Sequence, residues 1–203
     1  MKTSAAMNLA HMLPGFADPV HDSQRSFRCV LDALCRPGRV FTMPVPLTPP
    51  PGLSHSQCAI LLGLADQDTP IWLPPTLYDG LAGQYLRFHC GCPLTDDLAD
   101  AQFAVLGGLA QLPAHSALRL GEPAFPDRST TLIVEVNELS ASGPIRLTGP
   151  GIPDARSISV GGWTRYTTGF LQQNRAAFPL GVDIIFTNGA ELMALPRSTF
   201  VEA

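Results

Sequence analysis

Hydrophobic and polar positions in the first half of the chain follow a helical period that short apolar runs interrupt. The apolar residues of the first predicted helix recur at helical spacing, at Phe27, Val30, Leu31 and Leu34. Asp22 precedes them as an acidic cap, and Pro37-Gly38 follows them as a stop. Ser54 or Ser56 opens a second predicted helix that runs through Ala65, and an amphipathic pattern predicts a third helix over residues 77–88. These helices are separated by an extended segment at 40–45, a turn at 66–70 and a short buried strand at 71–73.

The second half is richer in β-forming runs. Strands are predicted at 102–106, 130–136, 145–148, 157–160, 182–187 and 191–195. The run at 130–136 is almost continuous in β-formers, which is typical of a strand covered on both faces. Residues 163–177 follow a helical pattern, and Asn188-Gly189 is a strong hairpin signal. The mixture predicts one α/β domain with helices on both faces of a mixed sheet.

Composition changes this picture through its low charge. Of the 203 residues 15% are charged, against about 25% in an ordinary globular domain. The net charge of −4 leaves no basic surface for a phosphate backbone or an anionic bilayer, so nucleic-acid and membrane-surface binding are excluded. A sparsely charged surface favours a protein that shares its surface with a partner. A compact enzyme with a large core is the alternative.

The basic residues narrow the possible chemistry further. Lys2 is the only lysine, and the other 12 basic residues are arginines. Chemistry that needs an interior lysine is therefore excluded, including a Schiff base to pyridoxal phosphate, and no cofactor is expected. Guanidinium groups bind phosphate or phosphonate in a bidentate manner, which makes Arg146 and Arg197 candidate binding residues.

The expected compartment is the cytoplasm. The longest apolar stretch begins at Cys58 and ends at Ala65, far short of the roughly 20 residues that a bilayer requires. Asn8, His11 and Pro14 interrupt the apolar region that a signal peptide needs near the N-terminus. The five cysteines are an odd number in a chain of this length, which argues against a disulfide framework.

Common catalytic motifs are absent from the sequence. The remaining candidate for a metal site is one short cluster of residues. His89-Cys90-Gly91-Cys92 groups three soft ligands, but zinc needs a fourth ligand and the cysteine spacing is shorter than usual. Buried thiols beside a hydrogen-bonded histidine are the simpler interpretation, so no metal site is predicted.

Three acidic residues are further candidates. Asp66 and Asp68 lie in a turn, where they either hold a divalent cation or, as we favour, bond to the turn's own backbone. Asp183 lies in an apolar strand and therefore needs a partner. The candidate arginine partners are Arg146, Arg175 and Arg197.

Segments along most of the chain resemble a known family. In order, they are Phe27-Arg28, Pro37-Gly38, Leu61-Leu62, Leu64-Ala65-Asp66, Asp68-Thr69-Pro70, Trp72-Leu73, Leu86-Arg87-Phe88-His89, Pro93-Leu94, Phe103-Ala104, Thr131-Leu132-Ile133, Arg146 to Ile152, Phe178 to Asp183 and Leu195 to Thr199. This pattern resembles the PhnH family, whose members are components of the carbon-phosphorus lyase core complex. Only the first 18 residues fall outside it. They are expected to form a flexible extension before one domain over residues 19–203.

The resemblance implies both a fold and a role. The implied fold is a three-layer α/β/α sandwich like that of pyridoxal-phosphate-dependent transferases, without the cofactor. The implied role is that of a component which, with the G, I and J subunits of the complex, supports transfer of a phosphonate to the ribose of ATP with loss of adenine. The chain is also expected to form a homodimer. Cys90 and Cys92 are not part of the family pattern, and no catalytic residue is transferred.

Two other functions stay open at this point. A free-standing enzyme would use Arg87, His89 and Asp183 or Asp66 around a small oxyanion substrate, with His89 as acid or base. A pure scaffold would need only its interfaces. Arg87 and His89 also suit a structural role, because basic side chains at the end of a helix bond to its last carbonyls.

Overall fold

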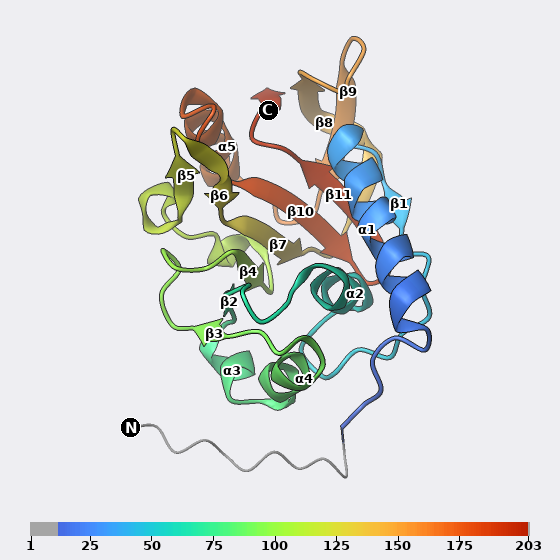
Figure 1. Cartoon of the computed structure of the whole chain (residues 1–203). Helices are drawn as coiled ribbons and strands as arrows, with labels where there is room; N and C mark the ends of the chain where they lie inside the picture. Colours follow the sequence, from blue (N-terminus) through green and yellow to red (C-terminus); the bar gives the residue numbers. More distant parts are fainter. Residues whose placement is uncertain (1–11, 203) are drawn as a thin grey trace.

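A seven-stranded mixed sheet forms the centre of the computed structural model, which describes residues 12–202 (Figure 1). In spatial order its strands are β1 (Phe41–Thr42), β11 (Glu191–Leu195), β10 (Asp183–Asn188), β7 (Thr131–Glu135), β4 (Phe103–Leu106), β2 (Ile71–Trp72) and β3 (Leu94–Thr95). The strands from β10 to β3 are parallel, whereas β11 is antiparallel to both of its neighbours. The predicted α/β class with a mixed sheet is confirmed.

Both faces of the sheet are buried, and consecutive residues of each strand serve opposite faces. In β7, Ile133 packs into the hydrophobic core on one face, while Leu132 and Val134 pack into the core on the other. In β10, Ile185 and Phe186 divide in the same way. A strand buried on both sides needs apolar residues at every position, which is why residues 130–136 read as a continuous run.

Four helices cover the first face. They are α1 (Pro19–Cys35), α2 (His55–Leu64), α3 (Pro75–Tyr78) and α4 (Leu81–Cys90). Of the two serines that the sequence offers for α2, Ser54 is the cap, and it forms a capping box with Gln57.

Helix α1 begins one turn earlier than predicted. Asp18 is its cap, and its carboxylate accepts a hydrogen bond from the backbone N–H of His21. Pro19 follows at the first helical position, where its missing N–H is no loss. The predicted cap, Asp22, is instead buried inside the helix and pairs with Arg25.

The predicted helix over 77–88 is two helices. Helix α3 ends at Tyr78, and α4 begins after Gly80. The two backbones then touch, because a Cβ atom on Gly83 would lie 2.1 Å from the Tyr78 carbonyl oxygen. Only glycine fits such an approach, so the periodic apolar pattern continues across a chain reversal.

The second face is covered by one helix and a small sheet rather than by helices alone. The helix is α5 (Arg165–Ala176), and the sheet consists of β12 (Phe200–Glu202), β8 (Leu139–Thr148) and β9 (Arg156–Val160). The predicted strands at 145–148 and 157–160 therefore exist but lie outside the main sheet. Shorter elements that the sequence did not predict connect β4 to β7, namely η2 (Leu109–Gln111), η3 (His115–Ala117), β5 (Leu120–Glu122) and β6 (Phe125–Ser129).

The hairpin between β10 and β11 forms where it was predicted, with its turn shifted by one residue. Asn188 pairs with Glu191, so the two loop residues are Gly189 and Ala190. Gly189 has a φ of +58° at the first loop position, which a type II′ turn requires and glycine allows.

The packed part of the chain begins before the predicted boundary at residue 19. The Tyr85 hydroxyl donates to the Pro14 carbonyl at 3.1 Å, and Leu13 and Phe16 pack against the core. Residues 1–11, with Lys2 among them, lie outside the described residues. In the described part of the chain, no helix has the length and apolar character needed to cross a bilayer.

Candidate functional site

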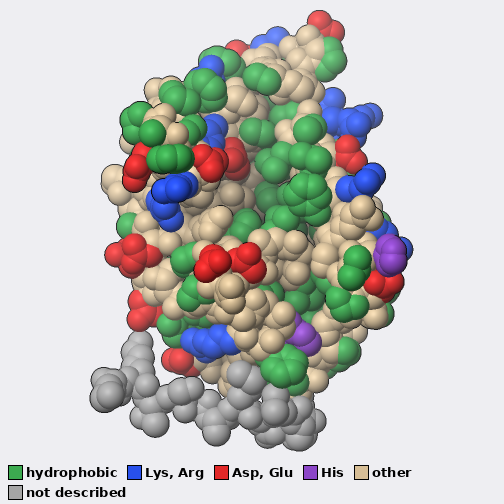
Figure 2. All heavy atoms as spheres, in the orientation of Figure 1, with side chains coloured by type: hydrophobic (Ala, Val, Ile, Leu, Met, Phe, Trp, Pro, Cys, Tyr) green, Lys and Arg blue, Asp and Glu red, His purple; other side chains and the backbone are tan. Residues whose placement is uncertain are grey.

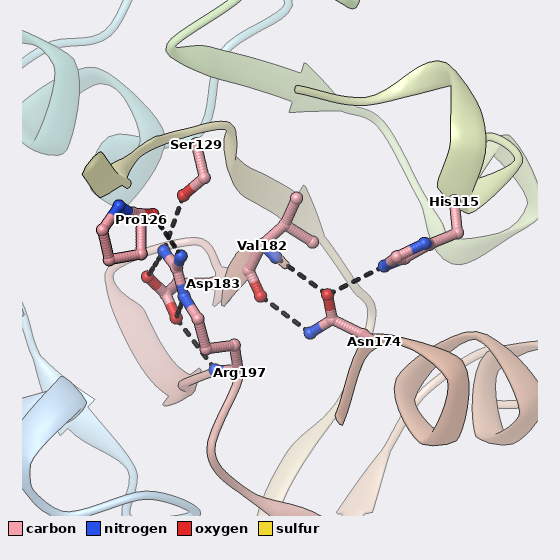
Figure 3. Close-up of polar contacts among 7 residues, drawn as sticks. All are labelled: His115, Pro126, Ser129, Asn174, Val182, Asp183 and Arg197. Carbon is pink, nitrogen blue, oxygen red and sulfur yellow. Dashed lines mark hydrogen bonds and ion pairs between the residues drawn. The ribbon is translucent and has the colours of Figure 1, made fainter. Parts of the chain in front are cut away.

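An ion pair fixes the start of β10, in the middle of the sheet (Figure 3). The Arg197 guanidinium donates to Asp183 twice, from Nε to Oδ1 at 3.2 Å and from Nη2 to Oδ2 at 2.6 Å. The Arg197 backbone N–H adds a third bond at 2.8 Å. The remaining donors reach the Pro126 carbonyl and Ser129 Oγ, both at 2.6 Å. Of the three arginines considered for Asp183, Arg197 is therefore the partner.

A second polar connection joins α5 to the residue before β10 (Figure 3). Asn174 Oδ1 accepts from the Val182 N–H at 2.8 Å, and its Nδ2 donates to the Val182 carbonyl at 2.9 Å. His115 Nε2 donates to the same Oδ1 at 3.1 Å. All three residues are buried. The Asn174 side chain thus provides hydrogen-bond partners for the backbone N–H and C=O of Val182, which precedes β10.

These two connections use their polar groups within the protein. The side chains of Arg197 and Asp183 are 13% and 24% exposed, so the pair is largely shielded from water. The Arg197 guanidinium is occupied by protein oxygens, which leaves it poorly suited to bind a phosphonate. Arg146, the other arginine considered for binding, pairs with Glu202 at 2.9 Å on an exposed surface.

Arg87 and His89 hold neighbouring segments of backbone. Arg87 stacks over the Tyr78 ring at 5.0 Å and donates to the Tyr78 carbonyl at 3.4 Å. His89 Nε2 donates to the Leu13 carbonyl at 2.9 Å. Within residues 12–202, neither side chain forms a hydrogen bond or ion pair with Asp183. These hydrogen bonds of Arg87 and His89 therefore go to backbone carbonyls, and none of them links either side chain to Asp183 or Asp66.

Of the cysteines beside His89, Cys90 is half-buried and Cys92 is buried. Cys90 Sγ donates to the Leu61 carbonyl at 3.7 Å, and Cys92 is buried. The hydrogen bond with Cys92 and then burial raise the pKa of Cys90 far above its usual range. Burial likewise raises the pKa of Cys58 to about 12. Among residues 12–202 no group of three or more His, Cys, Asp or Glu side chains is arranged to hold a metal ion.

Asp66 serves its own turn. Its Oδ1 accepts from the Asp68 N–H at 2.9 Å and from the Thr69 hydroxyl at 2.6 Å. The Thr69 hydroxyl bond is the largest cause of a lowered Asp66 pKa. This geometry matches the backbone-bonding interpretation that the sequence favoured over a cation site.

A cavity of about 680 Å³ lies at the carboxyl ends of β4 and β7. Parallel sheets commonly bind ligands at this edge. The lining includes Gly107-Gly108, Asn137, Gly161-Gly162 and Thr164, the cap of α5. A Cβ atom on Gly161 would lie 1.8 Å from Asn137 Oδ1, so the glycine is needed for the cavity wall to form.

The chemistry of this cavity is limited. Its one carboxylate, Glu135, accepts hydrogen bonds from the Thr187 hydroxyl and the Gly189 N–H and thereby holds the hairpin. Among the described residues, the lining contains no Lys, Arg, His or Cys side chain. The cavity offers amide and hydroxyl groups suited to binding, without a pair of groups suited to acid–base catalysis.

Comparison with known proteins places the chain in a family. The family model described as "Bacterial phosphonate metabolism protein (PhnH)" matches residues 14–202. The chain belongs to the PhnH family. The PhnH match starts within the segment that packs against α4, in agreement with a packed region that begins before residue 19.

Two PhnH-like relatives show how far the similarity extends. The chain is 37% identical over 187 residues to "Alpha-D-ribose 1-methylphosphonate 5-triphosphate synthase subunit PhnH" of Rhizobium meliloti (strain 1021), covering 92% of this chain and 94% of that protein. It is 31% identical over 181 residues to "Putative C-P lyase subunit protein HtxG" of Stutzerimonas stutzeri, covering 88% and 85%. The similarity spans nearly the whole of both relatives.

Sequence reasoning missed Asn174 and His115 in this PhnH chain. Asn174 follows Phe170 by four residues and so lies on the buried face of α5, where a polar side chain needs partners. A polar residue at a buried position of the predicted helix could therefore have identified Asn174 from the sequence. His115 had no such signal, because it lies in a short irregular connection with no periodic pattern.

Replacing Asn174 with Ala is expected to lower the free energy of unfolding by about 3 kcal/mol, because buried N–H and C=O groups lose their partners. Urea denaturation measures the change. Gln173→Ala, at an exposed position in the same turn, is the control and should change stability by less than about 0.5 kcal/mol. Equal effects of the two variants would contradict a structural role for the Asn174 amide.

Asp183→Asn is expected to cost about 3 kcal/mol, because it leaves a shielded guanidinium without its counter-ion. Glu202→Gln breaks the exposed pair with Arg146 and should cost less than about 1 kcal/mol. The same denaturation experiment compares both variants. If Asp183→Asn were as mild as Glu202→Gln, the ion pair would not hold the centre of the sheet.

Proposed function

We propose that this chain is the PhnH component of a carbon-phosphorus lyase core complex in phosphonate catabolism. In this role it supports the transfer of a phosphonate to the ribose of ATP with loss of adenine, which gives a ribose 1-phosphonate 5-triphosphate. The observation that carries the proposal is 37% identity, over nearly the full length of both chains, to a synthase subunit whose name describes this product with a methyl group.

The geometry supports an accessory role rather than catalysis by the isolated chain. Asp183, Arg197 and His115 are bonded inside the fold, and Arg87 and His89 hold backbone segments. The reacting groups are then supplied by other components of the complex, for which the G, I and J subunits are the proposed partners. The proposed site of action is the cytoplasm.

The proposed fold is similar to that of pyridoxal-phosphate-dependent transferases, without the cofactor. No lysine occurs after Lys2, so no residue of the packed domain can form the Schiff base on which that cofactor depends. A sheet of this kind would then serve as a scaffold, since function depends on sites rather than on the fold that carries them.

We also propose that two copies pair through the outer face of α1. This helix buries Cys29, Val30 and Ala33 against the core, yet Phe27 and Leu31 on its other side are 49% and 46% exposed. Folding requires a helix at the surface to bury only one apolar face, so apolar residues on its other side are available for a contact. Figure 2 shows hydrophobic side chains gathered in the upper middle of the visible surface, over the region where α1 runs beside β11. A two-fold contact would cover such a stripe with its own copy.

The tagged chain, expressed at its native level, should co-purify with the G, I and J subunits. Deletion of its gene should abolish growth on methylphosphonate as the sole phosphorus source, and the wild-type gene should restore growth. Absence of all three partners together with unimpaired growth would refute the proposed function. Turnover of methylphosphonate and ATP by the isolated chain would refute the accessory role.

Phe27→Asp combined with Leu31→Asp should convert a dimer of the isolated chain to a monomer, because the contact would then bury unpaired charges. Sedimentation velocity measures the state. Phe125→Asp, at a phenylalanine of β6 that is 45% exposed, is the matched control and should leave the dimer intact. A wild-type monomer, or a double variant that remains dimeric, would exclude α1 as the contact.

A further inference from the structure

Arg175, in the last turn of α5, lies between two phenylalanine rings. Its guanidinium carbon is 4.9 Å from the centre of the Phe178 ring and 4.2 Å from that of Phe200. Phe178 directly follows the helix, and Phe200 is the first residue of β12. Two rings on one guanidinium restrict its rotation and hold it in place, while the edges that carry its N–H donors stay free.

These donors are unpaired in the described part of the chain. Residues 12–202 provide no carboxylate and no hydrogen bond for the guanidinium, and the buried Nε–H has no partner. By contrast, Arg197 uses its donors on four oxygen atoms. A buried donor without a partner costs free energy. The guanidinium therefore has hydrogen-bond donors that the described part of the fold does not use.

Arg175 lines a groove of about 450 Å³ between the end of α5 and β12. The two phenylalanine rings are 51% and 47% exposed, so the groove offers apolar walls beside its cation. Its own acidic residue, Glu202, is engaged by Arg146. Acidic complementarity must therefore come from an occupant.

The far side of the groove is a strand edge. Among the strands within residues 12–202, β12 is an outer strand of the small sheet and pairs with β8 alone. The Val201 carbonyl faces α5, where Gln172 Nε2 approaches it at 3.5 Å, a long and weak hydrogen bond. An extended segment can replace this contact with a backbone hydrogen bond along the strand edge.

We propose that this groove docks another subunit of the complex through an acidic side chain on an extended segment with apolar neighbours. The inference rests on the proposed function. The carboxylate would pair with the Arg175 guanidinium in a bidentate manner, and the flanking apolar side chains would cover Phe178 and Phe200. A small oxyanion would satisfy the cation but would leave both rings in water, so a protein segment is the better match.

The first test compares two charge reversals in the co-purification experiment. Arg175→Glu should lower the capture of the G, I and J subunits by more than about tenfold, because it places like charges together at the contact. Arg128→Glu is the matched control, since Arg128 stacks at 4.1 Å on a single exposed ring, Phe125, in β6. This control should capture as much as the wild type.

The outcomes separate the two proposals. If the wild-type chain captures none of these partners, the proposed function fails. If the wild type and Arg175→Glu capture equally, the docking site alone is overturned. A variant that assembles normally but no longer binds methylphosphonate, or whose only defect is loss of a homodimer, would overturn it in favour of a small oxyanion or a second copy. Phe178→Ala with Phe200→Ala should weaken capture without a charge change, and thermal unfolding checks that each variant folds.

A second test locates the contact directly. With p-benzoylphenylalanine in place of Phe200, irradiation of the purified complex should crosslink this chain to a peptide of another subunit that contains Asp or Glu beside apolar residues. Mass spectrometry identifies the peptide. A crosslink to a second copy of this chain, to a peptide without an acidic residue, or to nothing would overturn the proposal.

Discussion

The ion pair of Asp183 and Arg197 is the interaction on which the rest of the structure depends. It joins the first residue of β10 to the chain that leaves β11, and through Ser129 and Pro126 it includes β6. β10 separates the two hydrophobic cores and pairs with β7 on one side and β11 on the other. A one-residue slip of this strand would exchange its two apolar faces, so a fixed start has consequences throughout the sheet.

The use of charged groups for bonds within the protein is also consistent with the low charge content. With 15% charged residues the chain has few ionic groups, and several of those that the structure describes serve internal bonds. The surface of the described residues then includes exposed apolar groups on α1 and, at the end of α5, an arginine that lies between two aromatic rings. These are features of contact surfaces rather than of a catalytic centre. A subunit of an assembly needs exposed contact surfaces of this kind.

Local patterns allowed much of the fold to be predicted. Continuous β-forming runs marked the central strands, and Ser54 and Gly189 obey rules of capping and turn geometry that act over a few residues. Pro19 obeys the same rules, but the predicted start of its helix at Asp22 was one turn too late. Tertiary contacts decided the rest. Gly83 lets two helices meet where the periodicity predicted one, and the strands at 145–148 and 157–160 form a sheet of their own. Asp183 visibly needed an arginine, but only the path of the chain after β11 selects Arg197 over Arg146 and Arg175.

Hydrogen exchange of the backbone amides tests the central claim most directly, that polar chemistry at β10 holds the fold while the outer surface makes the contacts. The isolated chain and the chain within the purified complex would be compared. We predict slower exchange in the complex at the end of α5 and in β12, with unchanged exchange at Asp183–Ile185. Unchanged exchange in β12, with new protection confined to Gly107-Gly108 and Gly161-Gly162, would contradict the claim and assign the function to the cavity instead.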